Sequence, residues 1–178
     1  MKWILALDEV LPDQTDQVGG KATALAQLTR SGLSVPQTLC VPSEVYRHYL
    51  AATGLEDRIL TELNRKAFDQ MRWEEIWDVA LRIRNMFLTT PLSADAETAL
   101  SEAVTEAFGN RPVAVRSSAP GEDNAQASFA GLHDSYLNLR GAAEILTHIR
   151  LVWASLWSDA APVSYTHLRA HETLTPIS

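Results

Sequence analysis

The sequence predicts an α+β fold, in which short strands are scattered among longer helices. Apolar residues recur at helical spacing over most of residues 56–110, which predicts a helical segment there. Short apolar runs at four other places predict strands, and we expect them to form a short mixed sheet with several helices. The 178 residues, 46% of them hydrophobic and 21% charged, fit one globular domain and exclude wholesale disorder.

Two strands and two helices are expected before residue 56. Apolar Ala22, Leu25 and Leu28 stand at three-residue steps and predict a helix, which Gly32 ends as a C-cap. Ser43 is a suitable N-cap for the second helix. The expected elements are a strand at 2–7, a loop at 8–17, a helix at 19–31, a strand at 38–41 and a helix at 44–53.

The rest of the chain is expected to be mainly helical. Tryptophans stand four residues apart in two of its helices, so each pair shares a helix face and should pack in the core or between lobes. The pairs are Trp73 with Trp77 and Trp153 with Trp157. The expected helices are 58–66, 73–88, 94–108 and 141–158, and the strands are 113–116 and 135–139.

Charge and cysteine content exclude several classes of protein. The net charge of −7 argues against a nonspecific nucleic-acid binder, and no stretch approaches the length of an apolar membrane span. Cys40 is the one cysteine, so neither a disulfide scaffold nor a cysteine-rich zinc site is available. The apolar run at the N-terminus is too short for a secretory signal, and we therefore expect a cytoplasmic protein.

The first candidate binding motif is Gly19-Gly20-Lys21, at the start of an expected helix. Paired glycines let the backbone approach a ligand closely, and a helix N-terminus offers N–H groups that suit phosphate. The motif is not a P-loop, which would need glycine at position 15 and serine or threonine at position 22, where the chain has Thr15 and Ala22. A plain glycine turn with a surface lysine is the alternative interpretation.

The second candidate is Arg116-Ser117-Ser118, followed by a loop of small and polar residues that runs to Gly131. Arginine offers a permanently charged fork for phosphate oxygens, and the loop offers backbone N–H groups. Glu122 and Asp123 in this loop are either metal ligands or solvated charges. An ordinary surface connection is the alternative, although loops of about 15 residues are usually functional or disordered.

Four ordered blocks form a more specific pattern than either motif alone. They are 18–26 with 32–36, then 113–119, then 122–123 with 127–131 and 135–138, and finally 153–157. Together they resemble the nucleotide-binding domain of the phosphoenolpyruvate synthase (pyruvate, water dikinase) family. Pyruvate phosphate dikinase and rifamycin phosphotransferase share this domain, and the resemblance covers roughly residues 2–165.

The resemblance implies the N-terminal part of an ATP-grasp-type domain, which holds ATP between two lobes. By position, Lys21 and Arg116 would contact the ATP phosphates, and the loop ending at Gly131 would close over them. Ser135 stands where the family usually has a threonine near the nucleotide. Mg²⁺ is the implied metal, and its ligands are expected in a second lobe that the sequence lacks.

Residues 1–162 are therefore expected to form a partial ATP-binding domain, which includes the helical segment at 56–110. From about Val163 the sequence stops resembling the family, and we expect residues 163–178 to be a tail of junction sequence on a truncated gene product.

The implied activity of the parent protein is the formation of phosphoenolpyruvate from pyruvate and ATP through a phosphohistidine relay. The fragment itself is expected to be inactive, and pyruvate or another small acceptor would bind only in the full-length protein. Neither nucleic acid nor membrane is an expected partner. Two alternatives stay open: the ATP domain of a rifamycin-type antibiotic phosphotransferase, and a non-catalytic nucleotide-binding or interaction module.

Overall fold

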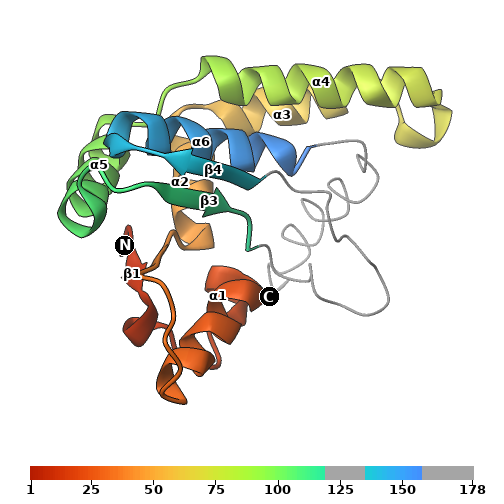
Figure 1. Cartoon of the computed structure of the whole chain (residues 1–178). Helices are drawn as coiled ribbons and strands as arrows, with labels where there is room; N and C mark the ends of the chain where they lie inside the picture. The colour runs from red at the N-terminus through yellow and green to blue at the C-terminus, as the bar shows by residue number, and fades with distance from the viewer. Residues whose placement is uncertain (119–134, 158–178) are drawn as a thin grey trace.

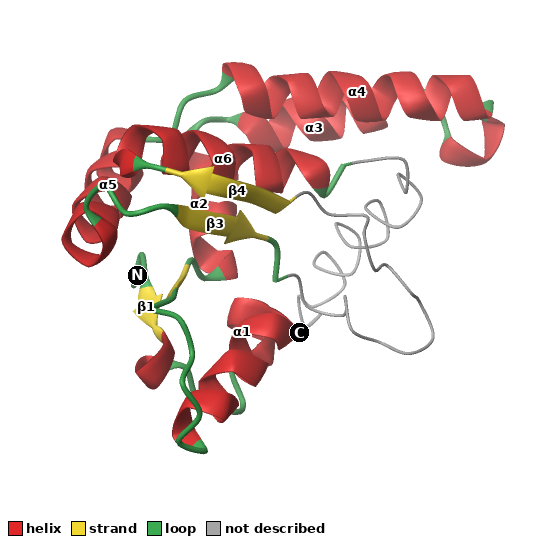
Figure 2. Cartoon of the chain, in the orientation of Figure 1, coloured by secondary structure: helices red, strands yellow, loops and turns green. Residues whose placement is uncertain are grey.

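The computed structural model describes residues 1–118 and 135–157. Six α-helices and two small sheets make up this part, which confirms the α+β class (Figures 1 and 2). The expected single mixed sheet is wrong for the described residues, because each strand pairs antiparallel with one partner only: β1 with β2, and β3 with β4. None of the helices in these ranges combines the length and apolar character needed to cross a bilayer.

The N-terminal unit consists of a two-stranded sheet and one long helix. Strands β1 (Leu5–Ala6) and β2 (Leu39–Cys40) are both shorter than expected, and a 3₁₀ turn at Leu7–Glu9 replaces the end of the predicted first strand. Helix α1 (Thr15–Arg30) packs on this turn. The shared apolar core contains Leu5, Leu7, Val10, Val18, Ala22, Ala26 and Cys40. Burial raises the pKa of the Cys40 thiol, which disfavours the reactive thiolate.

Helix α1 begins inside the segment that was expected to be a loop. Its first turn starts at Thr15, but the helix is interrupted at Gly19, whose φ of 81° and ψ of 165° are not helical. The chain therefore makes two helical stretches with a kink between them, and the second stretch matches the expected helix. This kink belongs to the first candidate motif.

The larger core is built by five helices. They are α2 (Ser43–Ala52), α3 (Leu55–Leu63), α4 (Trp73–Thr89), α5 (Ala94–Phe108) and α6 (Gly141–Ser155), with a 3₁₀ turn at Phe68–Gln70. Helix α6 packs against both α4 and α5, and in Figure 1 it runs along the β3–β4 pair. Aromatic rings fill the centre: Tyr49 lies 5.2 Å from Trp153 and 6.0 Å from Phe87, between ring centroids.

The two tryptophan pairs differ in their surroundings. Trp153 and Trp157 are buried, which confirms their predicted core packing. Trp73 and Trp77 are exposed, so a core role for this pair is wrong. The residues of α4 that enter the core are Ala80, Ile83 and Phe87, which occupy a neighbouring face of the helix.

Thr90, just after α4, joins three helices through buried polar contacts. Its carbonyl oxygen accepts hydrogen bonds from Tyr49 Oη at 2.8 Å and Arg150 Nη1 at 3.0 Å. Arg58 Nη1 donates to its Oγ1 at 3.1 Å. Burial raises the pKa of Tyr49 to about 12, so its hydroxyl remains a donor. These contacts attach α2, α3 and α6 to the end of α4.

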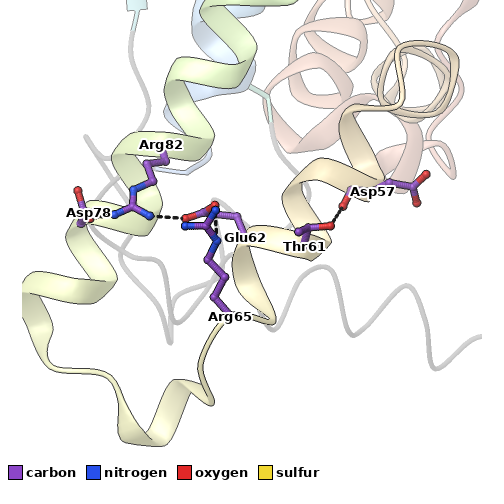
Figure 3. A network of polar contacts seen from close by, with 6 residues as sticks. All are labelled: Asp57, Thr61, Glu62, Arg65, Asp78 and Arg82. Atoms are coloured by element: carbon purple, nitrogen blue, oxygen red, sulfur yellow. Dashed lines mark hydrogen bonds and ion pairs between the residues drawn. The ribbon is translucent and has the colours of Figure 1, made fainter.

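A buried carboxylate connects α3 to α4, as Figure 3 shows. Glu62 accepts Arg82 Nη1 at 2.9 Å and pairs with Arg65 Nε at 3.1 Å. Arg82 also pairs with the exposed Asp78, one turn earlier on α4. The two carboxylates raise the pKa of Arg82, and the hydrogen bond with Glu62 is the largest single cause. Glu62 thus forms ion pairs with two guanidinium groups, one from each of the two segments that it connects.

Replacing Glu62 by glutamine is expected to lower the free energy of unfolding by about 1–3 kcal/mol, because the buried negative charge is lost and the amide N–H₂ would face one of the two guanidinium groups. The matched control is Asp78→Asn, which touches the same arginine. The Asp78 side chain is 54% exposed and that of Glu62 is 5% exposed, so this control should cost less than about 1 kcal/mol. Urea denaturation measures both, and equal losses would contradict the assigned role of Glu62.

Candidate functional site

The two candidate motifs, nearly 100 residues apart in the chain, meet in space. A Cβ atom built on Gly19 would lie 1.3 Å from the carbonyl oxygen of Ser118 and 2.6 Å from its Oγ. Figure 1 shows the chain that leaves β3 descending to α1. The kink of α1 therefore presses backbone against backbone at the exit of β3 (Val113–Arg116). Only glycine fits at position 19, since its φ of +81° also lies where side chains are rarely tolerated.

Ser118 takes the part of an N-cap for the second stretch of α1. The kink leaves the first N–H groups of this stretch without helical partners, and the N–H of Ala22 donates to Ser118 Oγ at 3.0 Å. Within the helix, the buried Thr23 Oγ1 donates to the Gly19 carbonyl at 2.9 Å. No local pattern in the sequence indicates this cap, because the donor and the acceptor are 96 residues apart.

Lys21 lies next to the second motif. Its Nζ donates a long hydrogen bond of 3.5 Å to the Ser117 carbonyl. Ser117 itself is buried. The ammonium group of Lys21 therefore lies beside Ser117, which directly follows Arg116 in the chain.

The β3–β4 pair brings Ser135 to the same place. Strand β4 (Ser135–Leu139) pairs antiparallel with β3, and its register sets Val113 opposite Leu139, Val115 opposite Tyr136, and Arg116 opposite Ser135. Val115 and Tyr136 pack against the larger core, so alternation places Arg116 and Ser135 on the other face, where both are exposed. A bulge at Leu137 and Asn138 lies between these pairs and the Leu139 end.

Three of the four predicted site residues therefore lie around one end of the hairpin. Lys21 reaches Ser117, Arg116 precedes Ser117, and Ser135 is the cross-strand partner of Arg116. Gly131 lies outside the described residues, as do Glu122 and Asp123 and the expected tail at 163–178.

The grouped residues have the chemistry of an anion site. Lys21 lies in the first turn of a helical stretch and reaches Ser117, the residue after Arg116, whose cross-strand partner is Ser135. Ammonium and guanidinium groups, hydroxyls and helix N-termini each favour phosphate oxygens. For metal binding, residues 1–118 and 135–157 contain no group of three or more His, Cys, Asp or Glu side chains placed to hold an ion.

A second surface feature lies away from this group, between α3 and α4. It is an open hollow of about 270 Å³, lined by Asp57, Arg58, Thr61, Glu62, Arg65 and Met86. Arg58 donates to Thr90 and Arg65 pairs with Glu62, so both guanidinium groups already serve the packing of the helices. We therefore assign this hollow a structural origin.

Comparison with known proteins identifies the domain type. Residues 15–174 match the family described as pyruvate phosphate dikinase, AMP/ATP-binding domain. The chain is 34% identical to a probable phosphoenolpyruvate synthase of Staphylothermus marinus, and the match covers 90% of this chain and 20% of that protein. It is 37% identical to a rifampicin phosphotransferase of Streptomyces sviceus, and this match covers 90% of this chain and 18% of that protein. The chain thus spans about a fifth of the length of these relatives.

Gly19→Ala is expected to separate the α1 kink from the β3 exit and to lower the free energy of unfolding by more than about 4 kcal/mol, through backbone strain and overlap with Ser118. Gly32→Ala is the matched control, because Gly32 also has a positive φ (+79°) but nothing within 4 Å of its added Cβ. Backbone strain alone should then cost about 1–2 kcal/mol. Chemical denaturation of both variants separates the cost of backbone strain from the cost of overlap with Ser118. Similar losses of unfolding free energy in the two variants would contradict the close contact.

Proposed function

Because the chain belongs to the pyruvate phosphate dikinase AMP/ATP-binding domain family, we propose that its described part forms one side of an ATP site at the end of the β3–β4 hairpin. The observation that carries this proposal is the approach of Gly19 to Ser118. It brings a lysine and an arginine from distant segments to one place, and a single polyphosphate can use both.

Each residue has a proposed part in this site. Lys21 and Arg116 bind and neutralise phosphate oxygens, the first as a point charge and the second as a planar fork. Ser135 offers a hydroxyl on the same hairpin face as Arg116, supported by their pairing in the register. The loop that ends at Gly131 closes over the nucleotide in this proposal. The enclosing architecture is of the ATP-grasp type, with the chain supplying the first lobe.

The metal of the reaction needs further ligands. The described residues suit the phosphates, but they hold no group of three potential ligands for an ion. We propose that the Mg²⁺ accompanying ATP is held by carboxylates of a second lobe, in another part of the parent protein. The work of Lys21 and Arg116 is to position the phosphates and to stabilise their charge, which is most of what a protein contributes to phosphoryl transfer.

The parent reaction we propose is phosphoryl transfer from ATP to pyruvate through a phosphohistidine, which yields phosphoenolpyruvate. The names of relatives such as the Staphylothermus marinus protein support it. Transfer to a rifamycin-type antibiotic is the second candidate, favoured by the 37% identity to a rifampicin phosphotransferase. The gene downstream of this segment discriminates them: a pyruvate-binding barrel indicates the first, and an antibiotic-binding domain indicates the second.

Lys21→Ala and Arg116→Ala are each expected to weaken ATP binding by about 5- to 50-fold, because each removes one charge-assisted contact to phosphate. Isothermal titration calorimetry at two salt concentrations measures this, and the wild-type affinity should fall as salt rises. Lys66→Ala is the control, since Lys66 pairs with Glu75 on the helical segment. Binding that survives both site substitutions would contradict the proposed site.

The chain of residues 1–178 is expected to bind ATP without hydrolysing or transferring its phosphate. The proposed metal carboxylates and the acceptor histidine are assigned to other parts of the parent protein. A phosphate-release assay with ATP and Mg²⁺ tests this, with the Lys21→Ala, Arg116→Ala double variant as background. Turnover that is lost in the double variant would show a complete enzyme and overturn the division of labour proposed above.

A further inference from the structure

Helix α4 carries an exposed apolar face, which we call the α4 stripe: Trp73, Trp77, Leu81 and Leu88. Their exposed fractions are 71%, 57%, 57% and 50%. At about 100° per residue, the four side chains fall within an arc of about 80° on the helix. This arc adjoins the face that Ala80, Ile83 and Phe87 bury in the core. The apolar surface of α4 is therefore wider than the part that the described fold covers.

Two charged residues adjoin the stripe, one near each end of α4. Glu74 lies at the edge of the arc in the N-terminal half, and Arg84 falls within the arc in the C-terminal half. The other charged residues of α4, Glu75, Asp78 and Arg82, lie outside the arc and form ion pairs within the chain. The stripe thus carries one acidic and one basic residue, and this arrangement is complementary to itself when reversed.

We propose that the α4 stripe is an interface between two copies of this chain, in which the two α4 helices pack antiparallel about a two-fold axis near Leu81. This arrangement sets Trp73 level with Leu88 of the second copy, and Trp77 level with its Arg84. A guanidinium group over an indole ring is a favourable contact. Glu74 stands three residues from that level, about 4.5 Å along the axis, within reach of the same Arg84.

The reverse orientation is disfavoured by the same residues. Two parallel α4 helices would set Glu74 against Glu74 and Arg84 against Arg84, and like charges in contact are destabilising. The antiparallel pair forms each Glu74–Arg84 contact twice and opposes the two helix dipoles. Symmetric pairing of one self-complementary patch is the commonest form of homodimer. The interface is separate from the candidate nucleotide site and does not depend on the proposed function.

Sedimentation equilibrium of the 178-residue chain tests the interface. We expect a reversible dimer in the micromolar range, weakened at least about 10-fold by Trp77→Ala. Glu74→Arg and Arg84→Glu should each weaken it about 5-fold, and the double variant should restore it, because the swapped charges attract again. Leu33→Ala is the matched control: Leu33 is 58% exposed but lies just after α1, so the dimer should persist.

Cysteine cross-linking tests the orientation. The native Cys40 is buried, so an added surface cysteine reports on its own position. Leu81→Cys should form a disulfide-linked dimer, since both copies lie near the axis. Trp73→Cys should not, because its two copies are about 22 Å apart along the antiparallel pair. A monomer at all concentrations, a dimer indifferent to the charge swap, or cross-linking through position 73 would overturn the proposal.

Discussion

The close approach of Gly19 to the carbonyl of Ser118 is the contact on which the candidate site depends. No other residue type fits there, because a Cβ would overlap the Ser118 oxygen and φ is +81°. This contact places Lys21 Nζ within hydrogen-bond distance of the Ser117 carbonyl and lets the N–H of Ala22 donate to Ser118 Oγ. The grouping of the cations thus follows from backbone geometry, which is less free to rearrange than long side chains.

The hairpin side of the site is supported by the larger core. Val115 and Tyr136 pack on that core, and the ring of Tyr136 lies 4.8 Å from that of His148 on α6. Helix α6 is attached in turn by Trp153 among the aromatic rings and by Arg150 at the Thr90 carbonyl. The proposed phosphate contacts therefore extend from a packed scaffold.

Local patterns in the sequence predicted where helices and strands lie, but not which elements pack against each other. The helix Ala94–Phe108 and both strands of the hairpin begin and end where periodicity and Gly109 indicate. The kink at Gly19 was missed, because its cause is a contact with a residue 99 positions away. A core position for Trp73 was wrong for a related reason, whereas packing between lobes stays a prediction: helical spacing shows that residues share a face, but not what covers it. Lys21 and Arg116 were predicted from motif chemistry and Ser135 from the family resemblance, and the fold supplied their grouping.

Amide hydrogen exchange at Ala22 tests the central claim most directly. Its N–H is the one that Ser118 Oγ accepts across the kink, whereas the N–H of Ala26 lies farther along the same helix. Ser118→Ala should speed exchange at Ala22 at least about 10-fold and leave Ala26 within about 2-fold, because only the cap is removed. Unchanged exchange at Ala22 in this variant would contradict the meeting of the two motifs.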